Sequence, residues 1–106
     1  MKLSIILSTR GRPHLLVPTV RRTLANVRNK ETRLMIVADE DDEATVLFRP
    51  QLEKMGANFW VGPRANSLGE KYNAGTMVEP GDVYLVMVDY APHITCLLYT
   101  SDAADE

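Results

Sequence analysis

Four short apolar runs divide the chain at regular intervals. They are 3–8, 33–38, 57–62 and 81–89, and most of their residues are aliphatic or β-branched. Runs of this length without a polar alternation are typical of strands buried on both faces. We therefore expect four buried strands, the last of which, "GDVYLVMVD", ends on a single acid, Asp89.

The segment between the first two runs has helical spacing. Apolar residues recur once per turn, at Leu16, Val20, Leu24 and Val27. This spacing predicts a helix with one apolar stripe. Because Pro18 interrupts the segment, the regular part is expected to begin near Val17 or Pro18 rather than at Pro13.

The next two segments also predict helices. One covers residues 43–55, with Asp42 as its cap and Pro50 as a break or kink. Its inward positions are expected to be Val46, Leu47 and Leu52. The other opens with a capping box of Ser67 and Glu70. Its core positions are expected to be Leu68, Tyr72 and Met77.

Alternating strands and helices predict the fold class: α/β, three-layer and Rossmann-like, with a mostly parallel sheet in a single domain. In such sheets ligands bind beyond the carboxyl ends of the strands. The polar chemistry of the chain is concentrated there, in "STRGRP", "DEDDE", "GPRANS" and "DYAPH".

The last eleven residues, "CLLYTSDAADE", do not continue any earlier pattern. They resemble the translation of a transposase-type sequencing adapter, so we expect a domain over residues 1–95 and a non-native tail over 96–106. Without the tail the formal charge changes from −2 to +1, twelve basic side chains against eleven acidic ones. The pI is therefore no guide to partners, and no nucleic-acid partner is expected. Cys96, the single cysteine, lies in the tail, so no disulfide or thiol chemistry is expected.

The apolar composition indicates no membrane span. Hydrophobic residues make up 45% of the chain, but no apolar run is long enough to cross a bilayer. The amino-terminal apolar stretch is too short for a signal peptide and is followed at once by Arg10 and Arg12. A cytoplasmic location is the resulting expectation.

Several polar residues are candidates for binding a nucleotide. Arg10 and Arg12 follow the first strand at a helix start, where they could meet a phosphate, although a solvated turn explains them equally well. Asp39 could accept hydrogen bonds from a base or ribose, whereas Glu40, Asp41 and Glu43 are predicted to be solvated acids. Lys71 could pair with a phosphate, with Asn73 beside it, although a plain surface charge explains Lys71 equally well.

Asp89 is the candidate metal ligand. An oxygen ligand at the end of a buried strand could hold Mg²⁺ or Mn²⁺ between the protein and a diphosphate. His93 is a weaker second candidate, since a lone histidine in a loop is more often polar surface.

Four of these segments together resemble one family. "LSIILSTRGRP", "VADEDD", "SLGEKYNAG" and "DVYLVMVDYAPHIT" are similar to the nucleotide-binding half of a family-2 type glycosyltransferase with the GT-A fold. The resemblance covers nearly all of residues 2–95. It implies a partial GT-A domain and a transferase that moves a sugar from a nucleotide-diphosphate-sugar donor to a glycan, lipid or protein acceptor.

The resemblance also implies roles for individual residues. Thr9, Arg10 and Pro13 would line the base, and Asp39 would read it. Lys71 and Asn73 would lie near ribose and phosphate. An Asp-x-Asp motif after the last strand would hold the divalent ion, but this chain has Asp89 followed by Tyr90 and Ala91.

Two alternatives stay open. One is a non-catalytic nucleotide- or glycan-binding domain that lost the second acid, which "DYA" favours. The other is a sugar-phosphate nucleotidyltransferase. That class has a glycine-rich loop before its arginine, whereas "LSTRGRP" contains only Gly11. An inverting transferase also needs a general base, expected downstream of Thr95, so residues 1–95 alone are expected to be inactive.

Overall fold

Each of the four apolar runs forms a strand in the computed structural model, which describes residues 2–27 and 30–89. The strands are β1 (Leu3–Ser8), β2 (Arg33–Asp39), β3 (Asn58–Gly62) and β4 (Val83–Val88). All neighbours in the sheet pair in parallel, in the order β3-β2-β1-β4. The predicted α/β class with a parallel sheet is therefore confirmed.

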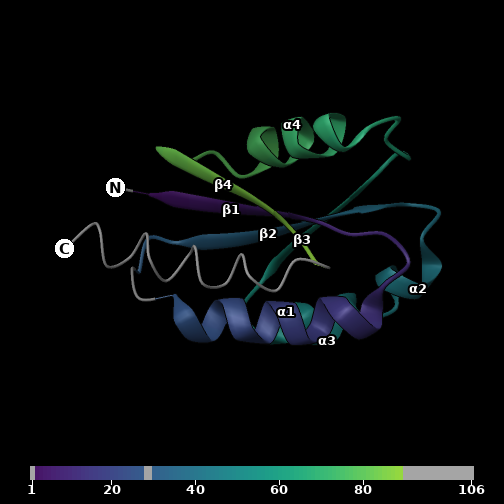
Figure 1. Cartoon of the computed structure of the whole chain (residues 1–106), viewed down its shortest axis with the longest axis horizontal. Coiled ribbons are helices and arrows are strands. Elements are labelled where there is room, and N and C mark those ends of the chain that lie inside the picture. Colours follow the sequence, from purple (N-terminus) through teal and green to yellow (C-terminus); the bar gives the residue numbers. More distant parts are fainter. Residues whose placement is uncertain (1, 28–29, 90–106) are drawn as a thin grey trace.

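Helices cover both faces of this sheet, which gives three layers (Figure 1). One layer contains α1 (Pro13–Asn26) and α3 (Arg49–Lys54), and the other contains α4 (Leu68–Val78). The short helix α2 (Glu43–Val46) lies beyond the carboxyl ends of the strands. Within the described residues the architecture is thus a Rossmann-like three-layer fold.

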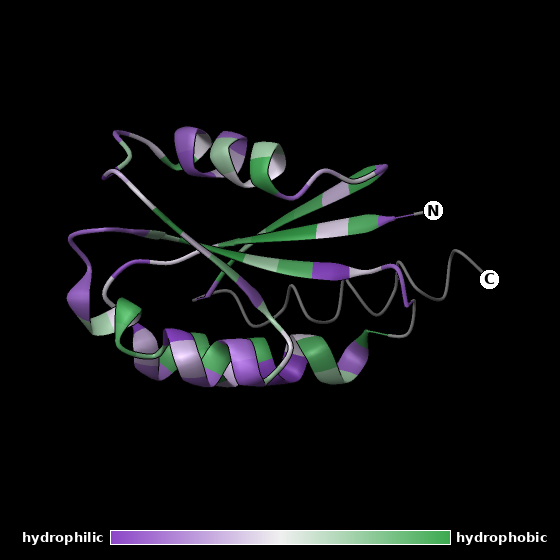
Figure 2. Ribbon diagram, turned by 180° about the vertical axis from the view of Figure 1, so that it is seen from behind, coloured by the Kyte–Doolittle hydropathy of each residue, from purple (hydrophilic) through white to green (hydrophobic). Residues whose placement is uncertain are grey.

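The two faces of the sheet bury apolar side chains unequally. The larger cluster lies on the α1 and α3 side and includes Ile5, Leu7, Leu16, Val20, Leu34, Ile36, Leu52 and Phe59. The smaller cluster, on the α4 side, contains Ile6, Met35 and Val37, with Trp60 and Tyr72 packed against it. Figure 2 shows the strands as the most continuously hydrophobic part of the chain. The sheet centre therefore provides most of the buried apolar surface, which is the main stabilising term.

Helix α1 begins earlier than its sequence predicts. It starts at Pro13 and continues through Pro18, so the expectation of a start near Val17 or Pro18 is wrong. Proline fits the first helical turn because that turn has no partners for its N–H groups. Pro18 and His14 are both exposed, so the His14 carbonyl that lacks a proline N–H partner lies where water can bind it. Leu16 and Val20 are buried as predicted.

The segment after β2 forms two short helices instead of one. The break falls before Pro50, which takes the second position of α3, so the predicted interruption is confirmed. Leu52 is buried, but Leu47 lies at the break and is 79% exposed, contrary to expectation. Thr45 is buried in its place. A break shifts the helical phase, so one apolar stripe cannot be extended across it.

Helix α4 contacts the sheet through a glycine. A Cβ atom at Gly75 would clash with the side chain of Ile6 and lie 3.0 Å from Val37 Cγ2. Only a residue without a side chain permits this close approach. Leu68 and Met77, which were expected to be core residues, are 48% and 80% exposed. The buried positions of α4 are Lys71 and Gly75, one turn apart.

Strand β4 is less buried than predicted. It pairs only with β1 in the sheet of the described residues, and Val83, Tyr84 and Val86 are all more than 40% exposed. The expectation of burial on both faces is wrong here because an edge strand has one neighbour and receives less cover. Met87, at its carboxyl end, is buried.

Some predictions fall on residues that the structure does not describe. His93, Cys96 and the suspected tail 96–106 lie outside the described residues. Among the helices that are described, none has the length and apolar character needed to cross a membrane.

Candidate functional site

The carboxyl ends of the four strands meet at one edge of the sheet, which we call the rim. It consists of residues 9–12 after β1, 39–42 after β2, 63–67 after β3, Asp89 after β4, and Lys71 on α4. The strand order changes direction at β1, because β2 and β3 follow on one side of it and β4 on the other. In open parallel sheets ligands bind at the carboxyl side of such a change.

A buried ion pair lies at the centre of the rim. Lys71 Nζ is 3.0 Å from Asp39 Oδ2 and also donates a hydrogen bond to the carbonyl oxygen of Thr9 at 2.8 Å. Asp39 is 2% exposed and Lys71 8%. Lysine is rarely buried unless it is paired. The close packing of Gly75, one turn further along α4, brings this lysine against the sheet.

Asp39 is held in its ionised form. Burial by itself raises the pKa of a carboxyl group, but hydrogen bonds from Lys71 and Arg10, and from the Ala65 N–H, outweigh it and lower the pKa of Asp39. Its Oδ1 accepts the Ala65 N–H at 3.2 Å, and its Oδ2 accepts Arg10 Nη1 at 2.8 Å. An ionised carboxylate only accepts hydrogen bonds, so Asp39 presents acceptors to any ligand.

Arg10 connects two acids of the second rim segment. Besides Asp39, its guanidinium donates to both oxygens of Asp41, at 2.7 and 3.1 Å. These bonds, first to Asp41 and then to Asp39, raise the pKa of Arg10 above its ordinary value. The same Arg10 contact lowers the pKa of Asp41. Arg64 approaches Asp41 from the third segment at 3.9 Å.

The turn after β1 is fixed by a carboxylate from the turn after β2. Gly11 adopts a φ of 64°, which an L-residue with a side chain rarely does. Its N–H donates to Asp42 Oδ2 at 2.7 Å, and the Thr45 hydroxyl donates to the same oxygen at 2.6 Å. Asp42 does occupy the predicted cap position of α2, but its side chain makes no capping bond there. It joins the two turns instead.

Asp89 lies at the end of β4 with its side chain fully covered. The Thr9 hydroxyl donates to Oδ2 at 2.7 Å, and Arg12 Nε donates to Oδ1 at 2.9 Å. The Thr19 hydroxyl donates to its backbone carbonyl at 3.2 Å. Both carboxylate oxygens are therefore engaged by protein donors.

This donor set does not fit a divalent cation. Mg²⁺ and Mn²⁺ need several oxygen ligands whose lone pairs face the ion, and a guanidinium on the same carboxylate repels it. Within residues 2–27 and 30–89, no three His, Cys, Asp or Glu side chains are grouped so that they could hold a metal. Mg²⁺ or Mn²⁺ at Asp89 stays a prediction.

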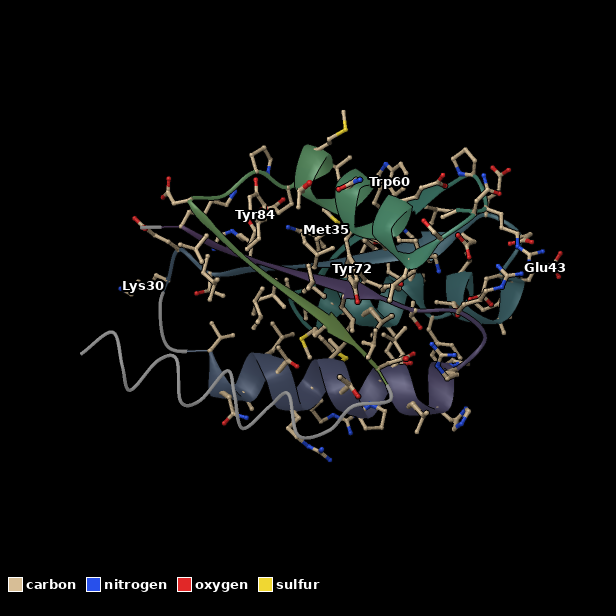
Figure 3. All side chains as sticks on the ribbon, turned by 45° about the horizontal axis from the view of Figure 1, so that its top comes forward. Lys30, Met35, Glu43, Trp60, Tyr72 and Tyr84 are labelled. Carbon is tan, nitrogen blue, oxygen red and sulfur yellow. The ribbon has the colours of Figure 1, made fainter. Side chains whose placement is uncertain are left out.

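Two neighbouring depressions open on the rim. One, of about 240 Å³, is lined by Ser8, Thr9, Arg10, Arg12, Asp39 and Lys71, with residues 64–68. The other, of about 180 Å³, has a more apolar wall formed by Trp60, Pro63 and Ala74. Asp39, Lys71, Arg64 and Ala65 line both. Figure 3 shows Trp60 beside α4, close to Met35 and Tyr72. The Asp39–Lys71 pair thus lies where a charged group and a flat apolar group could bind side by side.

Most of the predicted site residues come together. Thr9, Arg10, Arg12, Asp39 and Lys71 line the larger depression, and Asp89 contacts two of them. Asn73 does not join them, because it is exposed on α4 and lines neither depression. It lies two positions after Lys71, which turns it to the opposite side of the helix.

Sequence reasoning missed three contributors. Asp41 was predicted to be a solvated acid, yet it binds Arg10 with both oxygens. Asp42 was assigned to a helix cap, and Ala65 contributes a backbone N–H that no side-chain pattern shows. The partners lie 26 to 31 residues apart in the chain, so only the fold brings them together.

Comparison with known proteins gives no family assignment. No protein-family model matches the chain, and no curated protein is similar to it at a significant level. The class that the structure defines is therefore an α/β domain with a parallel sheet and a charged rim, and a fold of this kind does not by itself imply a function.

Proposed function

We propose that this domain binds a nucleotide-diphosphate sugar at the rim and is the donor-binding part of a glycosyltransferase. The observation that carries the proposal is the buried Asp39–Lys71 pair, with Arg10 and Arg12 beside it in one depression. A nucleotide diphosphate combines a base that needs fixed polar partners with phosphates that need cations. The rim offers both within one depression, and the family resemblance likewise implies that Asp39 reads the base and that Lys71 lies near ribose and phosphate.

Asp39 is the proposed reader of the base. Its Oδ1 accepts the Ala65 N–H, and a carboxylate oxygen accepts two hydrogen bonds, so it has capacity for a further donor. Uracil and guanine present a ring N–H at their pairing edge, whereas adenine and cytosine present an unprotonated ring nitrogen there. The ionised Asp39 therefore favours uracil or guanine.

Lys71, Arg10 and Arg12 are the proposed phosphate partners. Their charges would stabilise the diphosphate as it leaves during transfer of the sugar. Lys71 is fixed by two hydrogen-bond acceptors, Asp39 and the Thr9 carbonyl, so it is already oriented before a ligand binds. Orientation before binding lowers the entropic cost of association.

Fluorescence of the single tryptophan tests the proposal. Trp60 lines the smaller depression, next to Asp39 and Lys71. We expect UDP or GDP to change its emission on titration into the full chain, with an affinity about tenfold or more above that of CDP and ADP. Asp39→Asn should reduce this preference, because an amide can also donate.

The matched control is Asp82→Asn. Asp82 is an exposed acid at the amino ends of the strands, where its carboxylate accepts the Lys2 N–H. This variant should retain the preference of the unchanged chain. Equal binding of all four nucleotides, or binding of none, would contradict the proposal.

A non-catalytic binding domain is the second candidate. The observation that favours it is the engagement of both Asp89 oxygens by Thr9 and Arg12, together with "DYA" in place of Asp-x-Asp. A protein containing this domain that binds UDP or GDP tightly but turns over no nucleotide sugar would support it. Consumption of a sugar 1-phosphate and a nucleoside triphosphate, with formation of a nucleotide sugar and release of pyrophosphate, would instead indicate a nucleotidyltransferase.

A further inference from the structure

The strongest feature that the proposed function leaves unexplained is the Asp89–Arg12 pair. Asp89 has no exposed side-chain surface, whereas the Arg12 side chain is 36% exposed. The carboxylate thus faces the interior and the guanidinium reaches the rim depression that it lines. The Asp89 carboxylate therefore holds the Arg12 guanidinium in place, and the guanidinium faces the depression.

The contacts of Asp89 fix the direction of Arg12. Nε of the guanidinium donates to Oδ1, while Oδ2 is occupied by the Thr9 hydroxyl and cannot rotate away without breaking that bond. The Thr19 hydroxyl holds the backbone of Asp89 from α1. Residues that follow β1 and β4, and one on α1, therefore contribute to where this guanidinium lies.

Arginine is suited to the task that a divalent ion has in many phosphate sites. It stays charged at every accessible pH, and its planar donors match phosphate oxygens. Of the described acids at the rim, Asp39 is engaged by Lys71 and Arg10, and Asp89 by Arg12 and Thr9, so neither carboxylate is left open to a metal ion.

We propose that the diphosphate of the nucleotide binds to Arg12 at the rim without a divalent cation, and that Asp89 is the positioning residue for Arg12. This inference rests on the proposed function, since it concerns the same nucleotide. It differs from that function in assigning to a fixed guanidinium the charge that Mg²⁺ or Mn²⁺ would supply.

The first experiment compares nucleotide binding with and without metal. UDP and GDP are titrated into the full chain in excess MnCl₂ and in EDTA, with Trp60 emission as the readout and a nucleotide blank for each condition. We expect affinities that agree within about twofold. Binding that needs Mn²⁺ would overturn this inference and leave the proposed function standing, whereas binding of neither nucleotide in either condition would overturn both.

The second experiment separates phosphate contact from damage to the fold. Arg12→Gln should weaken UDP and GDP about tenfold, because a charged hydrogen bond is lost, and leave uridine and guanosine unchanged. Arg22→Gln, at an exposed position on α1, is the control and should change neither. Equal weakening of nucleotides and nucleosides by Arg12→Gln would contradict a phosphate contact.

The third experiment tests whether Asp89 acts through Arg12. Asp89→Asn should weaken UDP and GDP in the same direction as Arg12→Gln, and the double variant should bind no more weakly than Arg12→Gln alone. Additive losses would show that Asp89 acts independently and would overturn its positioning role. Binding that Mn²⁺ strengthens in the unchanged chain but not in Asp89→Asn would identify Asp89 as a metal ligand instead.

Discussion

At the scale of single residues, the rim consists of acidic and basic side chains whose charges neutralise one another in the absence of a ligand. Asp39 accepts from Lys71, Arg10 and the Ala65 N–H, while Asp89 accepts from Thr9 and Arg12. Burying such groups costs desolvation energy, and the cost is recovered only while every partner is present. The rim residues are therefore coupled, and removing one leaves a charge without its counterion.

Acid should destabilise the domain through Asp39. Its pKa is lowered in the folded state, so its contribution to stability is complete above the unfolded value of about 3.9 and is lost as the pH falls through the folded pKa. Asp39→Asn should lower the free energy of unfolding by about 3 kcal/mol at pH 7, because Lys71 loses its carboxylate.

Urea unfolding followed by circular dichroism at several pH values from 7 to about 2.5 measures this. The unchanged chain should lose stability below about pH 4, and the difference from Asp39→Asn should shrink there. A difference that stays constant across this range would show that ionisation of Asp39 contributes nothing.

The sequence predicted some of the residues that form the rim, but not the contacts between them. Thr9, Arg10, Arg12, Asp39 and Lys71 were all predicted to lie together because parallel strands end at one edge. Their pairing was not, since Lys71 reads in sequence as either a surface charge or a ligand contact. Its burial follows from the position of α4 on the sheet, which depends on Gly75 and Ile6.

At the scale of elements, the placement of α4 depends on how closely its backbone approaches β1 and β2. The helix buries a glycine and a lysine in place of the expected apolar stripe. Apolar spacing failed here because Leu68 and Met77 point away from the sheet. A hydrophobic pattern cannot reveal a face defined by the absence of a side chain.

Gly75→Ala tests this approach. Alanine favours a helix by about 1 kcal/mol over glycine, but the added methyl group would clash with Ile6 and press on Val37. We expect a net destabilisation of about 1 to 3 kcal/mol in urea unfolding.

Gly69→Ala is the matched control within the same helix. Its added Cβ would meet only Ser67 Oγ, at 3.8 Å. This variant should be neutral or stabilised by up to about 1 kcal/mol. Stabilisation of both variants alike would mean that α4 does not need the close contact at Gly75.

At the scale of the whole molecule, burial decreases from the sheet centre to the β4 edge. The apolar composition of β4 predicted a strand covered on both faces, but composition does not reveal that β4 has a single neighbour within the described residues. Strand order depends on long-range pairing, whereas the existence of each strand depends on local pattern, and only the latter was predicted correctly.

This difference in burial can be tested by truncating two valines on the α4 side of the sheet. Val37 on β2 is 1% exposed and Val86 on β4 is 47% exposed. Val37→Ala should cost about 2 kcal/mol of unfolding free energy, and Val86→Ala less than about 0.5 kcal/mol. Thermal or urea unfolding of the two variants gives the comparison, and equal losses would contradict the edge position of β4.

The bonds that join Thr9 to Asp89 and to Lys71 have a consequence for the order of folding. Their partners are 80 and 62 residues apart in the chain. During synthesis on the ribosome, Thr9 is made early, and its partner Asp89 is added only 80 residues later. Long loops of this kind close late, because their entropy must be overcome first. Assembly of the rim is thus a late event, because it requires that β4 has already paired with β1.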